Sequence, residues 1–279
     1  MRNLRKRLQS VYTEGEASAI LFLVLEKRFG LSRTDVLVGR LDSLASEDCD
    51  LLENIVCRLE QGEPVQYVLG EADFDGMTLG VGAGVLIPRP ETEELVEWIA
   101  EDFKGAKHLR ILDVGSGSGC IALALKRRFP DAEVRAWDIS DEALSIASAN
   151  AGSLGLDVVF ERRDALCTEV PEADFATYDV IVSNPPYICE KERADMDNNV
   201  LSHEPSTALF VPDSEPLLFY RAISEISLKM LRKGGSLYFE INREYGRETQ
   251  DMMSGMGYGA VALRQDFMEN DRMVKGVKP

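Results

Sequence analysis

The sequence predicts an α/β protein, in which a small helical N-terminal domain precedes a doubly wound, mostly parallel seven-stranded sheet. Three observations support this prediction. Residues 1 to about 62 carry apolar residues at helical spacing and no convincing strand pattern. From Arg110 onward, strand and helix patterns alternate, which is typical of a parallel sheet covered by helices on both faces. The chain has 279 residues, 45% of them hydrophobic, which is ample for such a core and excludes a disordered chain.

The N-terminal helices are indicated by two apolar stripes. One stripe lies within residues 17–24 and the other within residues 51–59, and Gly30 and Gly62 are typical helix stops. We therefore expect a helical domain over residues 1–62.

A different pattern begins at Pro64, where short extended segments alternate with glycines. Residues 67–70, 74–79 and 85–87 suggest a hairpin that joins two domains. Two prolines at 88 and 90 end this region, and acidic residues follow in what would be the first turn of a helix, where the helix dipole favours them. These changes predict a β-hairpin linker over residues 63–90 and a second domain over residues 91–279.

The second domain is predicted strand by strand. Its seven strands are expected at Arg110–Val114, Glu133–Trp137, Val158–Glu161, Asp179–Ser183, Ser236–Ile241, Ala260–Arg264 and Arg272–Val277. Its helices are expected at Cys120–Phe129, Glu142–Gly152, Pro216–Leu231 and Glu244–Met256. The longest polar stretch without a clear period, residues 190–215, is predicted to be a loop and a candidate for substrate contact.

The charge balance limits the possible partners. There are 31 Lys and Arg residues against 48 Asp and Glu residues, a net charge of −17. A field of that sign repels phosphate backbones and anionic membranes, so direct nucleic-acid binding is not expected. The basic start of the chain is followed by too short an apolar run for a signal peptide or a membrane span. These features predict a cytoplasmic protein with no membrane association.

Neither a disulfide framework nor a metal site is expected. The five cysteines are odd in number and scattered, with no C-x-x-C pair, which suits a reducing compartment. The only two histidines, His108 and His203, have no partner at metal-ligand spacing.

The first motif with chemical content is Gly115-Ser116-Gly117-Ser118-Gly119, which lies between a predicted strand and a predicted helix. Such a turn presents backbone N–H groups to a ligand that approaches very closely. The spacing G-x-G-x-G differs from the G-x-G-x-x-G of dinucleotide folds. It favours a ligand without a phosphate at that point, such as S-adenosylmethionine, over a bare turn.

Two acidic residues follow the next two strands. Asp138 ends the second strand, where a carboxylate can accept both hydroxyls of a ribose. It could instead cap the next helix, although Ser140 or Asp141 can serve as that cap. Asp164 has the equivalent position one strand further on and could meet an adenine amino group or only solvent.

The most specific motif is Asn184-Pro185-Pro186-Tyr187, directly after the fourth predicted strand. Two prolines hold the backbone extended and remove N–H donors, so the motif offers acceptors to a site at the carboxyl edge of the sheet. The Asn184 side-chain oxygen and the Pro185 carbonyl can hold both hydrogens of a planar NH₂ group and direct its nitrogen toward an electrophilic methyl group. Tyr187 can stack on the flat amide or base.

With these motifs in place, the chain closely resembles the protein-glutamine N5-methyltransferases that modify class 1 peptide chain release factors. The resemblance covers nearly the whole chain. The Ile-Pro-Arg-Pro-Glu-Thr segment matters most, because Asn-Pro-Pro-Tyr alone is shared with amino-methyltransferases that act on adenine or cytosine. The matching segments are residues 86–93, Asp113 to Gly119, Asn184 to Ile188, Glu204-Pro205 with Ala208-Leu209-Phe210, and Asp271-Arg272.

The resemblance implies a Rossmann-like class I methyltransferase that uses S-adenosylmethionine, releases S-adenosylhomocysteine and needs no metal. Its substrate would be the glutamine of the Gly-Gly-Gln motif of the release factor, gripped by the helical N-terminal domain, and the enzyme would be a monomer. The implied cofactor-binding residues are Gly115, Ser116, Gly117, Ser118, Gly119, Asp138, Asp164, Ala165 and Asn184. The implied substrate-binding residues are Asn184, Pro185, Pro186 and Tyr187, of which Asn184, Pro185 and Tyr187 would be catalytic.

The chain departs from the family pattern at three places. Ala165 stands where relatives often have an aromatic residue, Asn242 replaces a glycine, and residues 211–213 lack the usual glycines. We expect none of these to touch the methyl-transfer centre. Phe74 and the turn at residues 88–90 are further candidates for lining the glutamine pocket, or for packing between domains.

Three other functions agree less well with the sequence. An N6-adenine methyltransferase acting on DNA or RNA would use the same Asn-Pro-Pro-Tyr chemistry, but it should carry a basic, aromatic-rich recognition region, and none is visible. A non-catalytic nucleoside-binding module would be favoured by a degraded glycine turn, and this one is intact. The glycine spacing argues against a nicotinamide dehydrogenase.

Overall fold

The computed structural model describes residues 1–167 and 169–279 and divides the chain into two compact units. Unit 1 consists of Met1–Glu71 together with Asp197–His203. Unit 2 consists of Ala72–Met196 and Glu204–Pro279. No helix within the described ranges is both long and apolar enough to cross a membrane.

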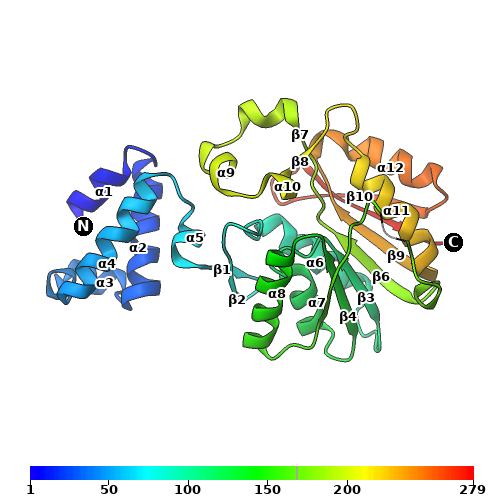
Figure 1. Ribbon diagram of the computed structural model, residues 1–279, viewed down its shortest axis with the longest axis horizontal. Helices are drawn as coiled ribbons and strands as arrows, with labels where there is room; N and C mark the ends of the chain where they lie inside the picture. The colour runs from blue at the N-terminus through cyan, green and yellow to red at the C-terminus, as the bar shows by residue number, and fades with distance from the viewer. Residues whose placement is uncertain (168) are drawn as a thin grey trace. The chain divides into compact units, whose positions relative to one another are not determined.

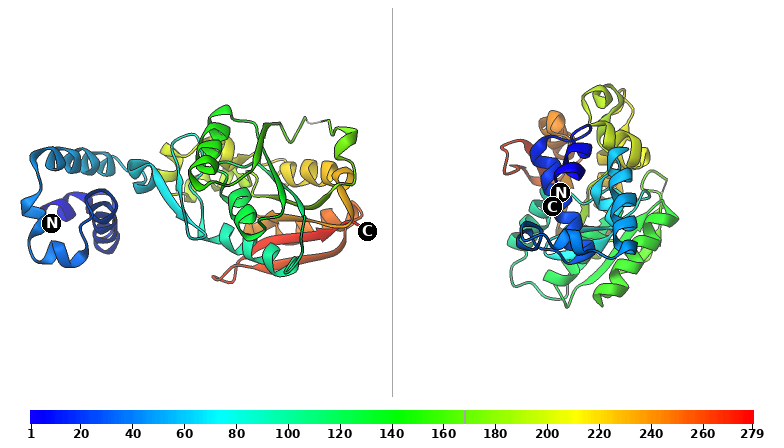
Figure 2. Two further views of the ribbon diagram at one scale, coloured as in Figure 1. Left: turned by 90° about the horizontal axis from the view of Figure 1, so that it is seen from below. Right: turned by 90° about the vertical axis from the view of Figure 1, so that its left-hand side faces the viewer.

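Unit 1 is a helical bundle, as the apolar stripes predict (Figure 1), and Figure 2 shows its blue helices from two further directions. The longest helix, α2, begins with a capping box between Thr13 and Glu16 and ends at Gly30, whose φ of 62° suits glycine. The core side chains of the unit, such as Leu21 on α2 and Leu59 on α4, are fully buried. The elements of the unit are α1 (Arg2–Leu8), α2 (Glu14–Phe29), α3 (Arg33–Leu37), η1 (Arg40–Ser43), α4 (Ser46–Glu60), α5 (Val65–Leu69) and α9 (Asn198–His203).

The predicted hairpin is only partly right. Residues 67–70, expected to be extended, form the end of α5 and its C-terminal Gly70, because Val65, Val68 and Leu69 bury their side chains in the helical core. The hairpin itself consists of β1 (Glu71–Phe74) and β2 (Met77–Gly80). Residues 85–87 form no strand.

Unit 2 contains a seven-stranded sheet in the order β10-β11-β9-β6-β3-β4-β5 (Figure 1). Five neighbouring strands from β9 to β5 are parallel, and β11 pairs antiparallel with both β9 and β10. The predicted doubly wound, mostly parallel fold is therefore confirmed. The strands are β3 (Arg110–Val114), β4 (Glu133–Asp138), β5 (Val159–Arg162), β6 (Tyr178–Ser183), β9 (Leu231–Glu240), β10 (Gly259–Gln265) and β11 (Asp271–Val277).

Helices cover both faces of the sheet, because successive strand residues alternate between two apolar cores. Ile111 packs in the core formed with α6, α7 and α8, whereas its neighbour Leu112 packs in the core formed with α11 and α12. The four helices expected with bounds are α7, α8, α11 and α12, each found within a few residues of its predicted ends, and α6 is the helix expected after the two prolines. The bounds are α6 (Pro90–Asp102), α7 (Cys120–Arg128), α8 (Asp141–Leu154), α11 (Leu218–Met230) and α12 (Gly246–Gly255).

The stretch from 190 to 215 is more ordered than the predicted loop. Its pieces are too short for a periodic pattern, and β8 forms only by pairing with β7, so that Ile188 lies beside Phe210. The short elements of this region and its surroundings are η2 (Glu172–Asp174), β7 (Ile188–Cys189), η3 (Glu190–Asp195), α10 (Ser206–Leu209), β8 (Phe210–Val211) and η4 (Arg243–Tyr245).

Candidate active site

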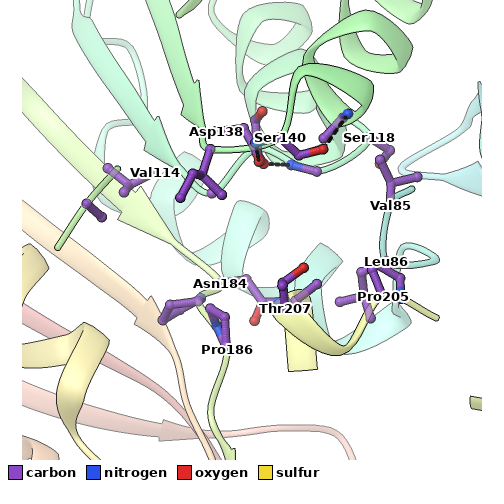
Figure 3. A pocket seen from close by; sticks show the side chains of 18 of the residues that line it. Val85, Leu86, Val114, Ser118, Asp138, Ser140, Asn184, Pro186, Pro205 and Thr207 are labelled. Carbon is purple, nitrogen blue, oxygen red and sulfur yellow. Dashed lines mark hydrogen bonds between the residues drawn. The ribbon is translucent and has the colours of Figure 1, made fainter. Parts of the chain in front are cut away.

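A cavity of about 590 Å³ lies in unit 2, where β3, β4 and β6 end. Its size is in the range of small-molecule sites. Figure 3 shows Ser118 and Asp138 on one side of the cavity and Asn184 and Pro186 across from them. Of the predicted site residues, the lining includes Gly115, Ser116, Gly117, Ser118, Asp138, Asp164, Ala165, Asn184, Pro185 and Pro186. It does not include Gly119 or Tyr187.

The glycine turn differs from the prediction in how its N–H groups are used. Those of Gly115 and Ser116 donate to the Trp137 carbonyl at 2.8 and 2.9 Å, and that of Gly117 donates to Asp138 Oδ2 at 2.8 Å. The expectation that these N–H groups are presented to a ligand is therefore wrong, because strand β4 already binds them. Gly117 allows a ligand to approach the backbone closely: its φ is +52°, and apart from Gly117 and its two chain neighbours no described residue has an atom within 4 Å of where a Cβ would stand.

Gly119 has a different use. A Cβ at this position would lie 3.1 Å from the Cβ of Ala147 on α8, so the absence of a side chain lets α7 and α8 pack closely. This explains why Gly119 belongs to the motif without lining the cavity.

Three buried polar atoms in or beside the turn have no hydrogen-bond partner among the described residues: Asp113 Oδ1, Ser116 Oγ and Ser118 Oγ. The other oxygen of Asp113 accepts the Ala122 N–H at 3.2 Å. Burial raises the pKa of Asp113 to about 7. Buried polar atoms normally have partners, so the hydroxyl of Ser116, which lines the cavity, is available to a ligand; Asp113 is fully buried and does not line the cavity.

Asp138 combines a structural contact with access to the cavity. Its Oδ2 accepts from Gly117, and its Oδ1 accepts the Ser140 N–H at 2.9 Å. The cap of α8 is Ser140, whose hydroxyl accepts the Ala143 N–H at 3.2 Å. Each carboxylate oxygen of Asp138 can accept a further hydrogen bond, so binding of ribose hydroxyls remains open to it.

On the opposite side, Asn184 belongs to a chain of hydrogen bonds that the sequence did not indicate. Its Nδ2 donates to Thr92 Oγ1 at 3.3 Å. The Thr92 hydroxyl donates to Glu240 Oε2 at 2.6 Å, and the Tyr187 hydroxyl donates to Glu240 Oε1 at 3.2 Å. Thr92 and Glu240 are both buried. The sequence alone marks Thr92 and Glu240 only in that each lies in a segment that resembles the family pattern.

Tyr187 lies apart from the cavity lining, and its predicted stacking on the substrate stays a prediction. Burial beside Glu240 raises the pKa of its hydroxyl, which keeps the group protonated and a donor. Asn242 Nδ2 donates to the Tyr187 carbonyl at 3.0 Å and to Glu192 Oε2 at 2.9 Å. Asn242 therefore holds the backbone of the last residue of the Asn-Pro-Pro-Tyr motif, and the expectation that it does not touch the methyl-transfer centre stays a prediction.

An ion pair between Arg89 and Glu204 borders the cavity. Arg89 Nη2 donates to Glu204 Oε1 at 2.5 Å, and Glu204 Oε2 accepts the Ile87 N–H at 3.3 Å. Pro88 and Arg89 line the cavity, whereas Phe74 is buried in the core of the sheet. Within the described part of the chain, no group of three or more His, Cys, Asp or Glu side chains could hold a metal ion.

The fold is that of a class I methyltransferase. Residues 91–206 match the family model described as the methyltransferase small domain, and residues 1–70 match the PrmC N-terminal domain. A solved methyltransferase from Pyrococcus furiosus has the same fold at 16% sequence identity, with a TM-score of 0.53, covering 73% of this chain and 89% of that one.

Two curated relatives define the family more closely. A release factor glutamine methyltransferase of Bacteroides thetaiotaomicron is 44% identical, covering 97% of this chain and 96% of the relative. One of Flavobacterium psychrophilum is 41% identical, covering 96% of this chain and 94% of the relative. The chain belongs to the family of release factor glutamine methyltransferases.

Proposed function

We propose that this protein transfers a methyl group from S-adenosylmethionine to the side-chain amide nitrogen (N5) of the glutamine in the Gly-Gly-Gln motif of class 1 release factors. The observation that carries this proposal is a single cavity, lined on one side by the glycine turn and on the other by Asn184 and Pro185. One site can therefore hold both the methyl donor and an amide acceptor.

The residues beside the glycine turn suit S-adenosylmethionine. Ser116, which lines the cavity, holds a buried polar atom for which the described residues supply no partner, and Gly117 leaves open space for a ligand. We assign cofactor binding to Gly115, Ser116, Gly117, Ser118, Asp138, Asp164, Ala165 and Asn184, with Gly119 shaping the turn by helix packing. S-adenosylmethionine supplies an electrophilic methyl group on sulfur, and S-adenosylhomocysteine is the product that remains.

The Asn-Pro-Pro-Tyr motif would hold the glutamine. The Asn184 Oδ1 and the Pro185 carbonyl each accept one hydrogen of the side-chain amide, and Pro186 continues an extended backbone without an N–H donor. This arrangement orients the nitrogen toward the methyl group and stabilises the positive charge that develops on it. No strong base is required before attack, because the nitrogen becomes acidic only once it carries that charge. Tyr187 stabilises this arrangement through the hydrogen bond that its hydroxyl donates to Glu240.

We assign the remaining parts of the chain as follows. Unit 1, which includes α5 and so extends beyond the helical domain expected over residues 1–62, grips the release factor, and unit 2 carries out methyl transfer. The enzyme acts in the cytoplasm as a monomer, without a metal and without direct nucleic-acid binding, in keeping with a net charge of −17.

The test is transfer of a radiolabelled methyl group from S-adenosylmethionine to three acceptors in parallel. These are an intact release factor, the same factor with its Gly-Gly-Gln glutamine replaced, and unmethylated duplex DNA. We expect label on the intact factor alone. Label on DNA, or equal label on both forms of the factor, would contradict the proposal and favour another amino substrate.

A further inference from the structure

We propose that Thr92 and Glu240 are positioning residues, which together determine which end of the Asn184 side-chain amide faces the cavity. This inference rests on the proposed methylation of an amide and names the groups that orient its acceptor.

The Thr92 hydroxyl carries a single hydrogen. A hydroxyl donates one hydrogen and can accept others, whereas a carboxylate only accepts. Thr92 Oγ1 lies 2.6 Å from Glu240 Oε2, so the Thr92 hydrogen goes to the carboxylate. Toward Asn184 the same oxygen can then only accept.

The orientation of the Asn184 side-chain amide follows from this. An asparagine amide has a donor end, Nδ2, and an acceptor end, Oδ1. Because Thr92 can only accept, it binds Nδ2, and the observed contact at 3.3 Å is of this kind. The Oδ1 atom is thereby directed away from Thr92, on a residue that lines the cavity. A glutamine amide then meets an acceptor there and not a second NH₂ group.

Glu240 is held as an acceptor by its surroundings. Its second oxygen, Oε1, accepts from the Tyr187 hydroxyl at 3.2 Å, so both oxygens receive a hydrogen. Burial raises the pKa of Glu240, and the Thr92 hydrogen bond, the positive charge of Arg272 and the Tyr187 hydrogen bond reduce this rise without reversing it. The acceptor role rests on the contacts: the 2.6 Å distance between Thr92 Oγ1 and Glu240 Oε2 is typical of a hydroxyl that donates to a carboxylate. The hydrogen bonds therefore have one direction, from the two hydroxyls toward the carboxylate.

Reversal of this direction would remove an acceptor from the site. If residue 240 donated a hydrogen, Thr92 could give its own hydrogen to Asn184 Oδ1, and the amide would turn its NH₂ group toward the substrate. Two donors would then oppose each other, and one of the two proposed acceptors would be lost. Such a loss affects the reacting geometry far more than the binding of the methyl donor.

The direct test replaces the Thr92 hydroxyl by a methyl group of similar size. We expect Thr92→Val to lower kcat for methyl transfer to a release factor about 100-fold, with KM for the factor and Kd for S-adenosylmethionine within about threefold of wild type. Thr92→Ser keeps the hydroxyl and should restore kcat to within about threefold of wild type. A residue that only supported the fold would not produce this separation of kcat from the two binding constants.

A matched control is Thr249→Val. Thr249 is also fully buried, and its hydroxyl donates to the Tyr245 carbonyl at 2.7 Å on α12, away from the cavity lining. Its loss should lower the melting temperature and leave kcat unchanged. An equal drop in kcat for Thr249→Val and Thr92→Val would overturn the positioning role.

A double-mutant cycle tests the direction of the chain. Glu240→Gln has the shape of the original side chain but can donate to Thr92, so we expect a loss of kcat similar to that of Thr92→Val. Because both changes break one chain, the double variant should lose little more than either single variant. Fully multiplicative losses would contradict the inference.

The wild-type protein is assayed first, so that two failures can be told apart. No label on the Gly-Gly-Gln glutamine would overturn the proposed function itself. Label with the wild type, together with a Thr92→Val rate within about threefold of it, would leave the function standing and overturn only the positioning role.

Discussion

The polar groups on the two sides of the cavity differ in whether they have hydrogen-bond partners. On the glycine-turn side, the cavity-lining Ser116 has a buried Oγ for which the described part of the chain supplies no partner; Asp113 Oδ1, outside the lining, also has none. Across the cavity, Asn184, Thr92 and Glu240 are joined in a continuous chain of hydrogen bonds. Figure 3 shows Ser118 and Asp138 on the glycine-turn side, facing Asn184 and Pro186.

The difference separates binding from catalysis. A buried polar atom without a partner destabilises a protein by about 1–3 kcal/mol, so the glycine-turn side gains free energy when a ligand supplies the missing contacts. The Asn184 side is already organised, so its acceptor needs no rearrangement as charge develops on the substrate. Changes on the first side should therefore affect affinity and stability, and changes on the second side should affect turnover.

The largest effect is expected for Asn184→Ala. The change removes the proposed acceptor and the group that Thr92 orients, so we expect kcat to fall about 1,000-fold while the Kd for S-adenosylmethionine changes less than about threefold. Single-turnover methyl transfer and equilibrium binding measure the two quantities. Asn270→Ala, in the turn between β10 and β11, is the control and should leave both unchanged. Turnover equal to that of the wild type would remove the proposed role of Asn184.

The buried carboxyl on the glycine-turn side predicts a pH-dependent stability. Burial raises the pKa of Asp113 to about 7, above the value of about 3.9 for an unfolded chain. The folded state therefore holds this proton longer, and stability is lost as pH rises through the folded pKa. Relative to Asp113→Asn, the unliganded wild type should lose about 3 kcal/mol of unfolding free energy between pH 5 and pH 8.

Urea denaturation of both forms at each pH measures this difference, and Asp266 supplies a control of opposite sign. Burial raises the pKa of Asp266, but the hydrogen bonds that it accepts from the Asn270 backbone and from Arg272 lower this pKa by a larger amount. The net shift is therefore downward. Its stabilising contribution should be lost as pH falls. A constant difference between wild type and Asp113→Asn across the pH range would contradict the assignment.

The sequence predicts features that are encoded locally. The strands of the sheet and the helices between them follow from apolar patterns within each segment, and the Asn-Pro-Pro-Tyr motif is contiguous. Thr92 and Glu240 escaped prediction because they lie 148 positions apart and meet only through the fold. The use of the glycine-turn N–H groups escaped for the same reason, since the Trp137 carbonyl that binds two of them belongs to another strand.

A short apolar run does not distinguish a strand from a helix, which is why the sequence predicts an extended segment at residues 67–70. Val65–Leu69 is only five residues long and includes β-branched valines, so its pattern suits either a strand or a helix. The choice is made by the apolar core of unit 1, which buries Val65, Val68 and Leu69 together. Tertiary packing of this kind is absent from any local window of sequence.

A smaller effect, confined to affinity, is expected for Gly117→Ala. The added Cβ would occupy open space in the cavity, at a residue with φ of +52°. We expect Kd for S-adenosylmethionine to rise about tenfold, with kcat at saturating cofactor changing less. Gly105→Ala is a matched control, since Gly105 also has positive φ (+79°) and open surroundings among the described atoms but does not line the cavity. A similar rise in Kd for both variants would mean that backbone strain and not lost ligand space is responsible.

The smallest effects are expected on the free energy of unfolding, for substitutions of two buried serines near the ends of neighbouring strands. Ser183 donates its hydroxyl to the Val114 carbonyl at 2.5 Å, so Ser183→Ala should destabilise the unliganded protein by about 1–2 kcal/mol. Ser116→Ala removes a hydroxyl that has no partner among residues 1–167 and 169–279, so it should be neutral or stabilising by about 0.5 kcal/mol. Denaturant unfolding without ligand measures both. Saturating S-adenosylmethionine should reverse the advantage of Ser116→Ala, because the wild-type hydroxyl then gains its partner; an unchanged advantage would show that this hydroxyl does not contact the cofactor.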